Sequence, residues 1–144
     1  MLAGQTARYL ELQLRDFQDG RRQRPTQAAQ TATLQAMTRT DLRRPAAWYA
    51  GQAALPPRAG VAPDAASAKL GKADEALCTT CHLGGFAGQH EIPRVAGQGF
   101  DAVLQQLRAF KSGERSNDGG NMSAVTRLLT DAELQHVAHD ITGL

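Results

Sequence analysis

The most reactive residue types in this sequence stand together in one run, Cys78-Thr79-Thr80-Cys81-His82. Two thiols separated by two residues can add to the two vinyl groups of a haem, and the histidine that follows is then placed to bind the iron. One ring nitrogen of His82 would bind the metal, and the other would donate a hydrogen bond that fixes the orientation of the ring. The run therefore predicts one covalently attached haem, held by Cys78, Cys81 and His82.

Two other interpretations of the cysteines are open. A Cys-x-x-Cys pair can be a thioredoxin-like dithiol, and two cysteines with one histidine can form part of a zinc site. The dithiol requires a preceding strand and a mixed sheet, and zinc requires a fourth ligand at a matching spacing. The chain has only two cysteines, and its many alanine, glutamine and leucine residues favour helices. We therefore prefer haem attachment.

Met122 is the candidate for the second protein ligand of the iron, because it is the only methionine after the cysteines. It follows a turn of flexible composition at 117–121, and a thioether ligand raises the reduction potential of a haem. The alternative is a methionine that fills a gap in the core. His90 competes for the same role, although it lies only eight residues beyond His82.

An internal repeat organises the rest of the chain and appears when the sequence is shifted against itself by 93 residues. The matching pairs are 2–5 with 95–98 and 13–17 with 106–110. After a length change, Leu34 falls opposite Met122. The first copy lacks the Cys-x-x-Cys-His run, and it is either cut short upstream of Met1 or a haemless module kept for docking.

Helical spacing of apolar residues predicts the main elements of both copies. The second copy has a stripe that ends before Gly113, formed by Phe100, Val103, Leu104, Leu107 and Phe110. Thr130 and Glu133 predict a capping box at the start of a terminal helix. Its apolar face is Leu134, Val137, Ala138 and Ile141, which leaves His136 and His139 on the surface. In the first copy, Pro45 indicates a closing helix that begins late.

These patterns predict an all-α protein with three segments. Residues 1–51 form a partial, haemless module, residues 52–67 form a linker rich in proline and alanine, and residues 68–144 form the haem domain. A module of this size is marginal on burial alone, so we expect the haem to complete its core and the apo protein to be poorly folded. The expected core residues are Phe86, Val95, Leu104, Leu107, Val125 and Leu128.

The charge is unevenly distributed. Residues 1–63 carry nine arginines against four acids, a balance of +5, and residues 64–144 carry seven basic residues against ten acids, a balance of −3. No nucleic-acid recognition motif accompanies the arginines, so we expect a solvated face or a face for an acidic partner, and no nucleic acid. No segment is long and apolar enough to span a bilayer, and the first residues lack the features of a signal peptide.

With these residues in place, the sequence resembles class I cytochromes c and most closely the cytochrome c4 family. The resemblance covers nearly the whole chain and rests on four segments, which are 78–82, 92–98, 106–113 and 121–124. It implies a small class I cytochrome fold around one haem, with thioether bonds at Cys78 and Cys81. It also implies axial ligation of the iron by His82 and Met122, and a Pro93 carbonyl that accepts the ring proton of His82.

The resemblance further implies a periplasmic protein, whose signal peptide is upstream of or missing from this chain, that carries single electrons and catalyses no reaction. A quinol-oxidising complex or a dehydrogenase would supply the electrons and an oxidase or reductase would receive them, with peripheral association at membrane complexes. One alternative is a cytochrome subunit or domain of a periplasmic dehydrogenase. Another is an interaction module whose basic first half binds a partner.

Overall fold

The structure is a computed structural model and describes residues 1–23, 28–54 and 77–143 of the chain. The helices are α1 (Ala7–Gln18), α2 (Ala28–Gln35), α3 (Arg39–Ala50), η2 (Gly84–Phe86), α5 (Phe100–Ser112), α6 (Asn121–Arg127) and α7 (Asp131–Gly143), and residues 77–82 are also helical. In these ranges there is no strand, only an isolated bridge between Gln89 and Ile92, which confirms the all-α prediction. Residues 55–67 of the expected linker lie outside the described residues. The expected boundary at residue 68 lies outside them as well.

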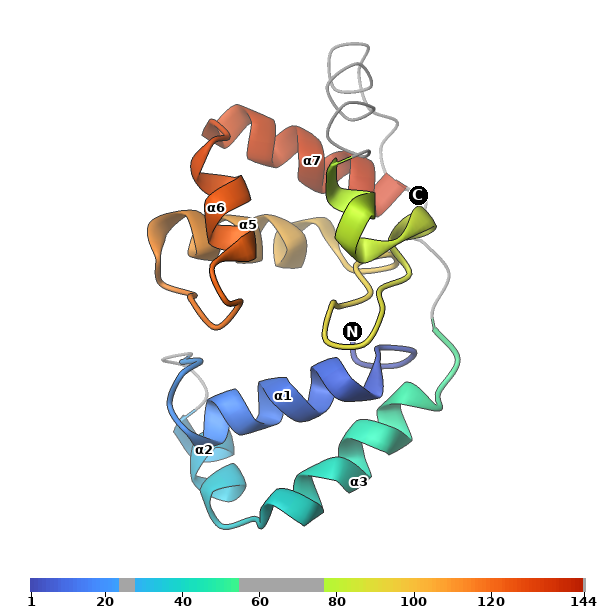
Figure 1. The fold of residues 1–144 in the computed structure, drawn as a ribbon, viewed down its shortest axis with the longest axis vertical. Coiled ribbons are helices and arrows are strands. Elements are labelled where there is room, and N and C mark those ends of the chain that lie inside the picture. The colour runs from blue at the N-terminus through green and yellow to red at the C-terminus, as the bar shows by residue number, and fades with distance from the viewer. Residues whose placement is uncertain (24–27, 55–76, 144) are drawn as a thin grey trace.

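The helices form two groups that lie one above the other in Figure 1. In the first group α1 packs against α2 and α3, and in the second α5 packs against α6 and α7. Two loops of the second group, at 87–97 and 113–120, run toward α1 (Figure 1). None of the described helices is long and apolar enough to cross a membrane.

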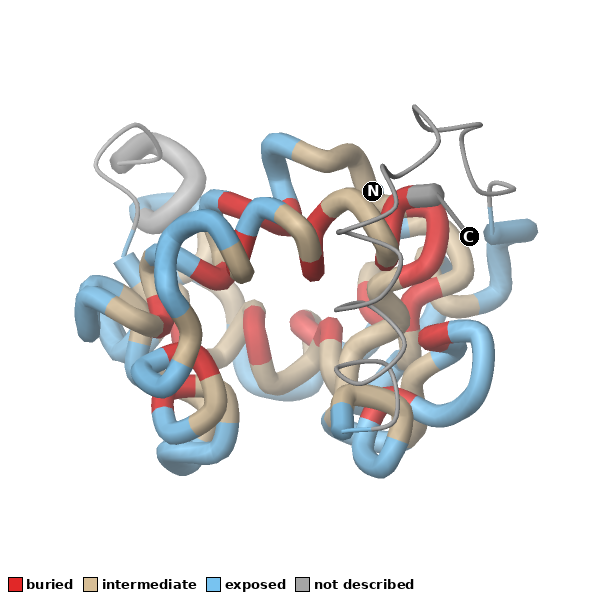
Figure 2. Tube along the Cα trace, turned by 90° about the horizontal axis from the view of Figure 1, so that it is seen from above, coloured by how far each residue is buried: buried red, intermediate tan, exposed pale blue. Residues whose placement is uncertain are grey.

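The core of the second group follows the predicted apolar stripes. Phe86, Ala96, α5 and α7 supply its buried side chains, and the inner sides of the helices carry the buried positions of the trace (Figure 2). Three of the expected core residues are not fully buried: Leu128 is 84% exposed, Val125 is half-buried, and Val95 is half-buried but packs against the core. The reason is that α6 ends at Arg127, so that Leu128 becomes the C-cap and Leu129 packs against the core in its place.

The closing helix of the first copy does not begin late. α3 starts at Arg39, six residues before Pro45, because Thr38 and Asp41 form a complete capping box. An internal proline removes one backbone donor and its ring crowds the carbonyl of residue i−4, but the capping box and the burial of Leu42 and Ala46 stabilise the helix. Pro45 therefore lies inside α3, and the expectation from sequence was wrong.

Helix caps also set the alignment of the two copies. Thr130 caps α7 and exchanges hydrogen bonds with Glu133, as predicted, and Thr38 does the same with Asp41 in α3. Matching Thr38 with Thr130 requires a shift of 130 − 38 = 92 residues, and this shift places Gln30, not Leu34, opposite Met122. The first copy still has no methionine at the equivalent position.

The two histidines of α7 are less exposed than expected. Both are half-buried, and the ring of His139 packs against Phe100 with 4.3 Å between ring centroids. The apolar stripe of α7 is otherwise as predicted, since Leu134, Val137, Ala138 and Ile141 are all buried. His139 lies beside this stripe. The ring of Phe100, at the start of α5, covers His139 and so reduces its exposure.

Candidate haem site

His82 is the last residue of the helical segment 77–82, and its side chain is buried. Its Nδ1 atom lies 2.8 Å from the carbonyl oxygen of Pro93, the hydrogen bond that the resemblance implied. Burial lowers the pKa of His82, and the hydrogen bond to Pro93 acts in the opposite direction. A neutral imidazole with Nδ1 engaged in this way has Nε2 available as a metal ligand.

The loop after His82 bends back on itself to bring Pro93 to the histidine. Leu83, Phe86 and His90 all adopt left-handed backbone conformations, with φ of 63°, 52° and 47°. Such conformations cost about 1 kcal/mol or more each for a residue with a side chain, and they persist only where the surroundings hold them. The carbonyl of Phe86 accepts the backbone N–H groups of Val95 and Ala96, which closes the loop.

The two cysteines lie on the helical segment that ends at His82, and both are free thiols. Cys78 is half-buried and packs against the apolar core of the second helical group. Cys81 is exposed, and its carbonyl accepts a hydrogen bond from the side chain of Gln89 at 3.2 Å. A tetrapyrrole bound through both thiols would therefore have one edge on the core and the other toward the surface.

Met122 lies in the first turn of α6 and packs against the same core as Cys78. The hydroxyl of Thr126, which is fully buried, donates a hydrogen bond to the Met122 carbonyl at 2.8 Å. On the other side, the Asp118 carboxylate accepts the backbone N–H of Ser123 at 2.8 Å. The backbone of the Met122 turn is thus held from both ends.

Asp118 is a residue whose role the sequence did not reveal. Partial burial opposes its ionisation, yet the backbone N–H groups of Ser123, Gly120 and Met122 hold the pKa of the carboxylate below its ordinary value. An aspartate ahead of a short helix is a common N-terminal signal, and that signal could have identified it. Gly88 was also missed, although it packs directly against the backbone of Pro93.

The donor set suits a haem better than it suits zinc. One imidazole, one thioether and two thiols are the groups that a c-type haem and its iron require. In the part of the chain that the structure describes, no group of three or more His, Cys, Asp and Glu side chains could hold a metal ion. His90, the competing ligand, is exposed.

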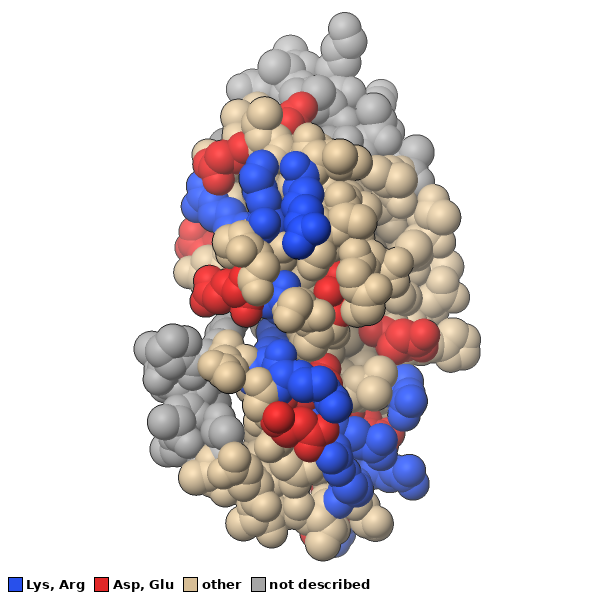
Figure 3. Space-filling model, turned by 60° about the vertical axis from the view of Figure 1, so that its left-hand side comes forward, with Lys and Arg blue, Asp and Glu red and all other residues tan. Residues whose placement is uncertain are grey.

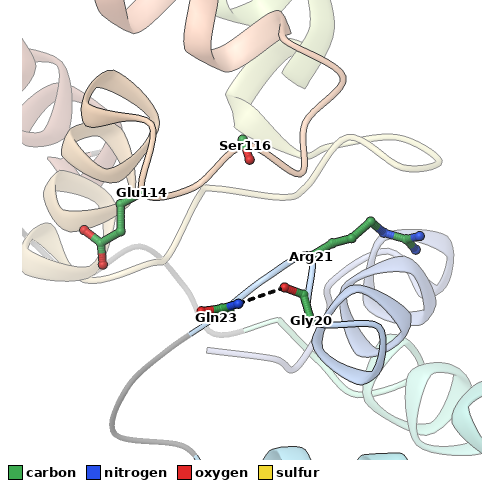
Figure 4. Close-up of a pocket in the computed structure, with 5 residues that line it drawn as sticks. All are labelled: Gly20, Arg21, Gln23, Glu114 and Ser116. Atoms are coloured by element: carbon green, nitrogen blue, oxygen red, sulfur yellow. Dashed lines mark hydrogen bonds between the residues drawn. The ribbon is translucent and has the colours of Figure 1, made fainter.

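A pocket between the two helical groups is a separate feature (Figure 4). It is lined by Gly20, Arg21 and Gln23 from the first group and by Glu114 and Ser116 from the second. Gln23 donates a hydrogen bond to the carbonyl of Gly20, and the Arg21 side chain points away from Gln23 (Figure 4). The pocket contains no thiol, thioether or imidazole, so it has no part in binding the haem.

The comparisons with known proteins concern the chain as a whole. The chain is 33% identical over 152 residues to cytochrome c4 of Pseudomonas aeruginosa, covering 99% of this chain and 74% of that relative. It is also 33% identical to the thiosulfate dehydrogenase electron acceptor of Thiomonas intermedia, covering 95% of this chain and 66% of the relative. No family model matches the sequence.

A solved structure with the same fold is that of cytochrome c4 from Acidithiobacillus ferrooxidans. It superposes with a TM-score of 0.84 at 27% identity, covering 99% of this chain and 88% of that chain. The similarity in sequence and in fold to these proteins defines the class as c-type cytochromes. Within this class, the chain belongs to the cytochrome c4 family.

Family membership establishes the general function. The cofactor is covalently bound haem c with its iron, and the protein is an electron carrier, not an enzyme. Its partners are therefore redox partners. The relatives are longer than this chain, which spans about three quarters of the curated cytochromes c4 that it matches.

Proposed function

We propose that this chain holds one haem through Cys78 and Cys81, with His82 and Met122 as the two protein ligands of its iron, and that it shuttles single electrons in the periplasm. The hydrogen bond between His82 and the Pro93 carbonyl is the observation that carries the proposal, because it orients the imidazole and leaves one nitrogen for the metal. When bound, the haem supplies a one-electron couple between ferric and ferrous iron.

The protein residues then have three tasks. His82 and Met122 would hold the iron as its two protein ligands, which would exclude small ligands such as oxygen, and a thioether ligand would raise the reduction potential. The apolar side chains against which Cys78 and Met122 pack would help to shield the haem from water. In this proposal, residues 68–144 are the haem domain, and residues 1–51 are a partial module without a haem motif that supports it.

Met122→Ala tests the ligand assignment. We expect the variant to lose the far-red methionine-to-iron charge-transfer band of the oxidised protein and to have a lower reduction potential. Met37→Ala is the matched control, because Met37 is half-buried in the first helical group and has no proposed contact with the haem. A Met122→Ala protein with the band and the potential of the wild type would exclude Met122 as a ligand.

A dehydrogenase as electron donor is the second part of the proposal. One relative is named as the electron acceptor of thiosulfate dehydrogenase, so an enzyme of that kind is a candidate donor here. Arginines of α1 and α3, among them Arg8, Arg39 and Arg43, are exposed but pair with Glu11 or Asp19, and Figure 3 shows Lys and Arg side chains along one face with Asp and Glu among them. The excess of arginines over acids in this half of the chain favours a donor with an acidic surface.

The donor can be tested directly by mixing the oxidised cytochrome with a thiosulfate dehydrogenase and thiosulfate. Reduction of the haem that slows as the salt concentration rises would support this donor, because salt screens attraction between exposed charges. If the enzyme leaves the haem oxidised, a different donor, such as a quinol-oxidising complex, is indicated. Co-purification with a catalytic subunit would instead favour a fixed subunit of a dehydrogenase.

A further inference from the structure

The loops at 87–97 and 113–120, which lie next to the proposed iron ligands in the sequence, both contact the first helical group. We propose that Gln13 and Asp16 of α1 are positioning residues for Met122, an inference that rests on the proposed function. Through them, the first module controls how firmly the methionine holds the iron. The two residues lie more than 100 positions before Met122 in the sequence and belong to the other copy of the repeat.

The contacts of α1 with the loop at 113–120 are direct and partly buried. The side-chain amide of Asn117 donates to Gln13 Oε1 at 2.9 Å and to Asp16 Oδ2 at 2.6 Å. Arg115 of the same loop donates to Gln13 Oε1 at 3.1 Å. Gln13 and Asp16 are each only 8% exposed, so these hydrogen bonds are shielded from water and stronger than surface contacts.

This loop needs such an anchor because its own backbone is permissive. It begins at Gly113 and ends at Gly119 and Gly120, and all three glycines have positive φ angles. Glycine loses more conformational freedom on ordering than any other residue. Asn117 is adjacent to Asp118, whose carboxylate accepts the backbone N–H of Ser123 in the Met122 turn. The contact with α1 is therefore linked to Met122 through the peptide unit between Asn117 and Asp118 and through this hydrogen bond.

A second contact reaches the loop on the histidine side. The side-chain amide of Gln5 donates to the carbonyl of Arg94 at 2.8 Å and accepts from the Arg94 backbone N–H at 2.6 Å. Arg94 follows Pro93, whose carbonyl orients His82. The first module is therefore in contact with the supports of both proposed ligands, and of the two loops the one before Met122 has more glycines with positive φ.

The contact between the modules is built on the repeat itself, which gives it a defined geometry. Arg22 donates to Gln13 in its own copy and to Gln106 in the other, and Arg115, its equivalent, donates to Gln106 and to Gln13 in turn. Each guanidinium also lies over the phenylalanine of its own copy, Phe17 or Phe110. Such a crossed arrangement holds α1 at one place relative to the loop.

The test compares two double variants of the full-length haem protein. Gln13→Ala with Asp16→Ala removes the anchor, and Gln18→Ala with Asp19→Ala is the matched control at the same end of α1. In the control pair, Gln18 bonds to the carbonyls of Leu34 and Met37, and Asp19 pairs with Arg21 and Arg39, all within the first module.

Imidazole is the probe, because it binds ferric iron only after Met122 has left it. We expect the anchor variant to bind imidazole about three- to tenfold more tightly than the wild type, as the loss of buried hydrogen bonds would allow, and its reduction potential to fall. The control variant should bind imidazole as the wild type does. Asp16→Asn, which preserves size and an acceptor oxygen, should give a smaller shift in the same direction.

Two results would overturn the inference. One is an anchor variant, or Asp16→Asn if the double variant fails to fold, that binds imidazole with wild-type affinity. The other is a control variant that shifts as much as the anchor variant, which would reveal a general loosening of the first module. A wild-type protein with no methionine-dependent far-red band would instead refute the ligand assignment under the proposed function.

Discussion

Gly88 is the residue on which the position of Pro93 most directly depends. Its φ is +76°, and a Cβ atom built there would lie 2.3 Å from the backbone nitrogen of Arg94 and 2.5 Å from the carbonyl carbon of Pro93. Neither backbone atom can move without shifting the carbonyl that accepts from His82. At this position the fold requires glycine for both its conformation and its size.

Gly88→Ala should therefore lower the free energy of unfolding of the haem protein by about 3 kcal/mol, the range of a buried steric conflict. The measurement is denaturant unfolding followed by circular dichroism. Gly99→Ala is the matched control, since Gly99 has an ordinary φ of −76° and nothing near its Cβ position. Equal losses in the two variants would contradict this role for Gly88.

Thr126 is the second residue with a defined effect on the site. Its buried hydroxyl donates to the Met122 carbonyl, and Thr126→Val removes the hydrogen bond while retaining the shape of the side chain. We expect a loss of about 1 kcal/mol in stability together with a shift in reduction potential.

Thr142→Val provides the comparison for Thr126→Val. Thr142 is also buried and donates to the Ala138 carbonyl at 2.8 Å, but it lies in α7, away from Met122. Its replacement should cost similar stability and leave the potential unchanged. If both variants shift the potential equally, Thr126 has no particular influence on the methionine.

At this scale the sequence indicates the candidate chemical groups more readily than the residues that support them. Cys78 to His82 and Met122 were recognisable because their types and spacing carry the chemistry. Gln5 and Gln13 could be recognised only as matching residues of the repeat, because their partners, Arg94 and Asn117, lie 89 and 104 positions away. A side-chain amide that bonds to a distant backbone leaves no local pattern.

At the scale of elements, helix-capping residues predicted where helices begin better than the helix-breaking proline did. Thr130 with Glu133 correctly predicted the start of α7, whereas Pro45 wrongly suggested a late start for α3. The signal for the correct start, Thr38 with Asp41, was present in the sequence. A capping box fixes where the helix begins, and the packing of Leu42 and Ala46 helps α3 to continue through the internal proline.

The first turn of α7 has a pH dependence that can be predicted. Hydrogen bonds from Arg108 lower the pKa of Asp131 to about 2. Because the folded-state pKa lies below the ordinary value of 3.8, the ionised carboxylate stabilises the fold above about pH 4, and this contribution is lost as the pH falls toward 2. The effect is small, since the pair is exposed.

Asp131→Asn tests this dependence through thermal unfolding. The variant should melt slightly below the wild type near neutral pH, and the difference should shrink as the pH is lowered toward 2. Asp101→Asn, in the exposed first turn of α5, serves as the control. A difference between Asp131→Asn and the wild type that grows as the pH falls would have the wrong sign.

At the scale of the whole molecule, the two copies of the repeated module have different roles in the proposed function. The second contains Cys78, Cys81, His82 and Met122, the proposed donors for the haem, and the first contributes side chains that contact the loops at 87–97 and 113–120. The repeat was recognisable from sequence, but its alignment near Met122 was not, because the loops between the helices differ in length. Only the caps of α3 and α7 establish that Gln30 stands opposite Met122.

The central claim is that Cys78 and Cys81 bind one haem covalently. Protein produced in the periplasm of a host that attaches haem should be analysed by a pyridine haemochrome spectrum together with mass spectrometry after thiol alkylation. The account predicts one haem per chain, bound by two thioether bonds, with neither cysteine alkylated. A colourless protein in which both Cys78 and Cys81 react with the alkylating agent would contradict it.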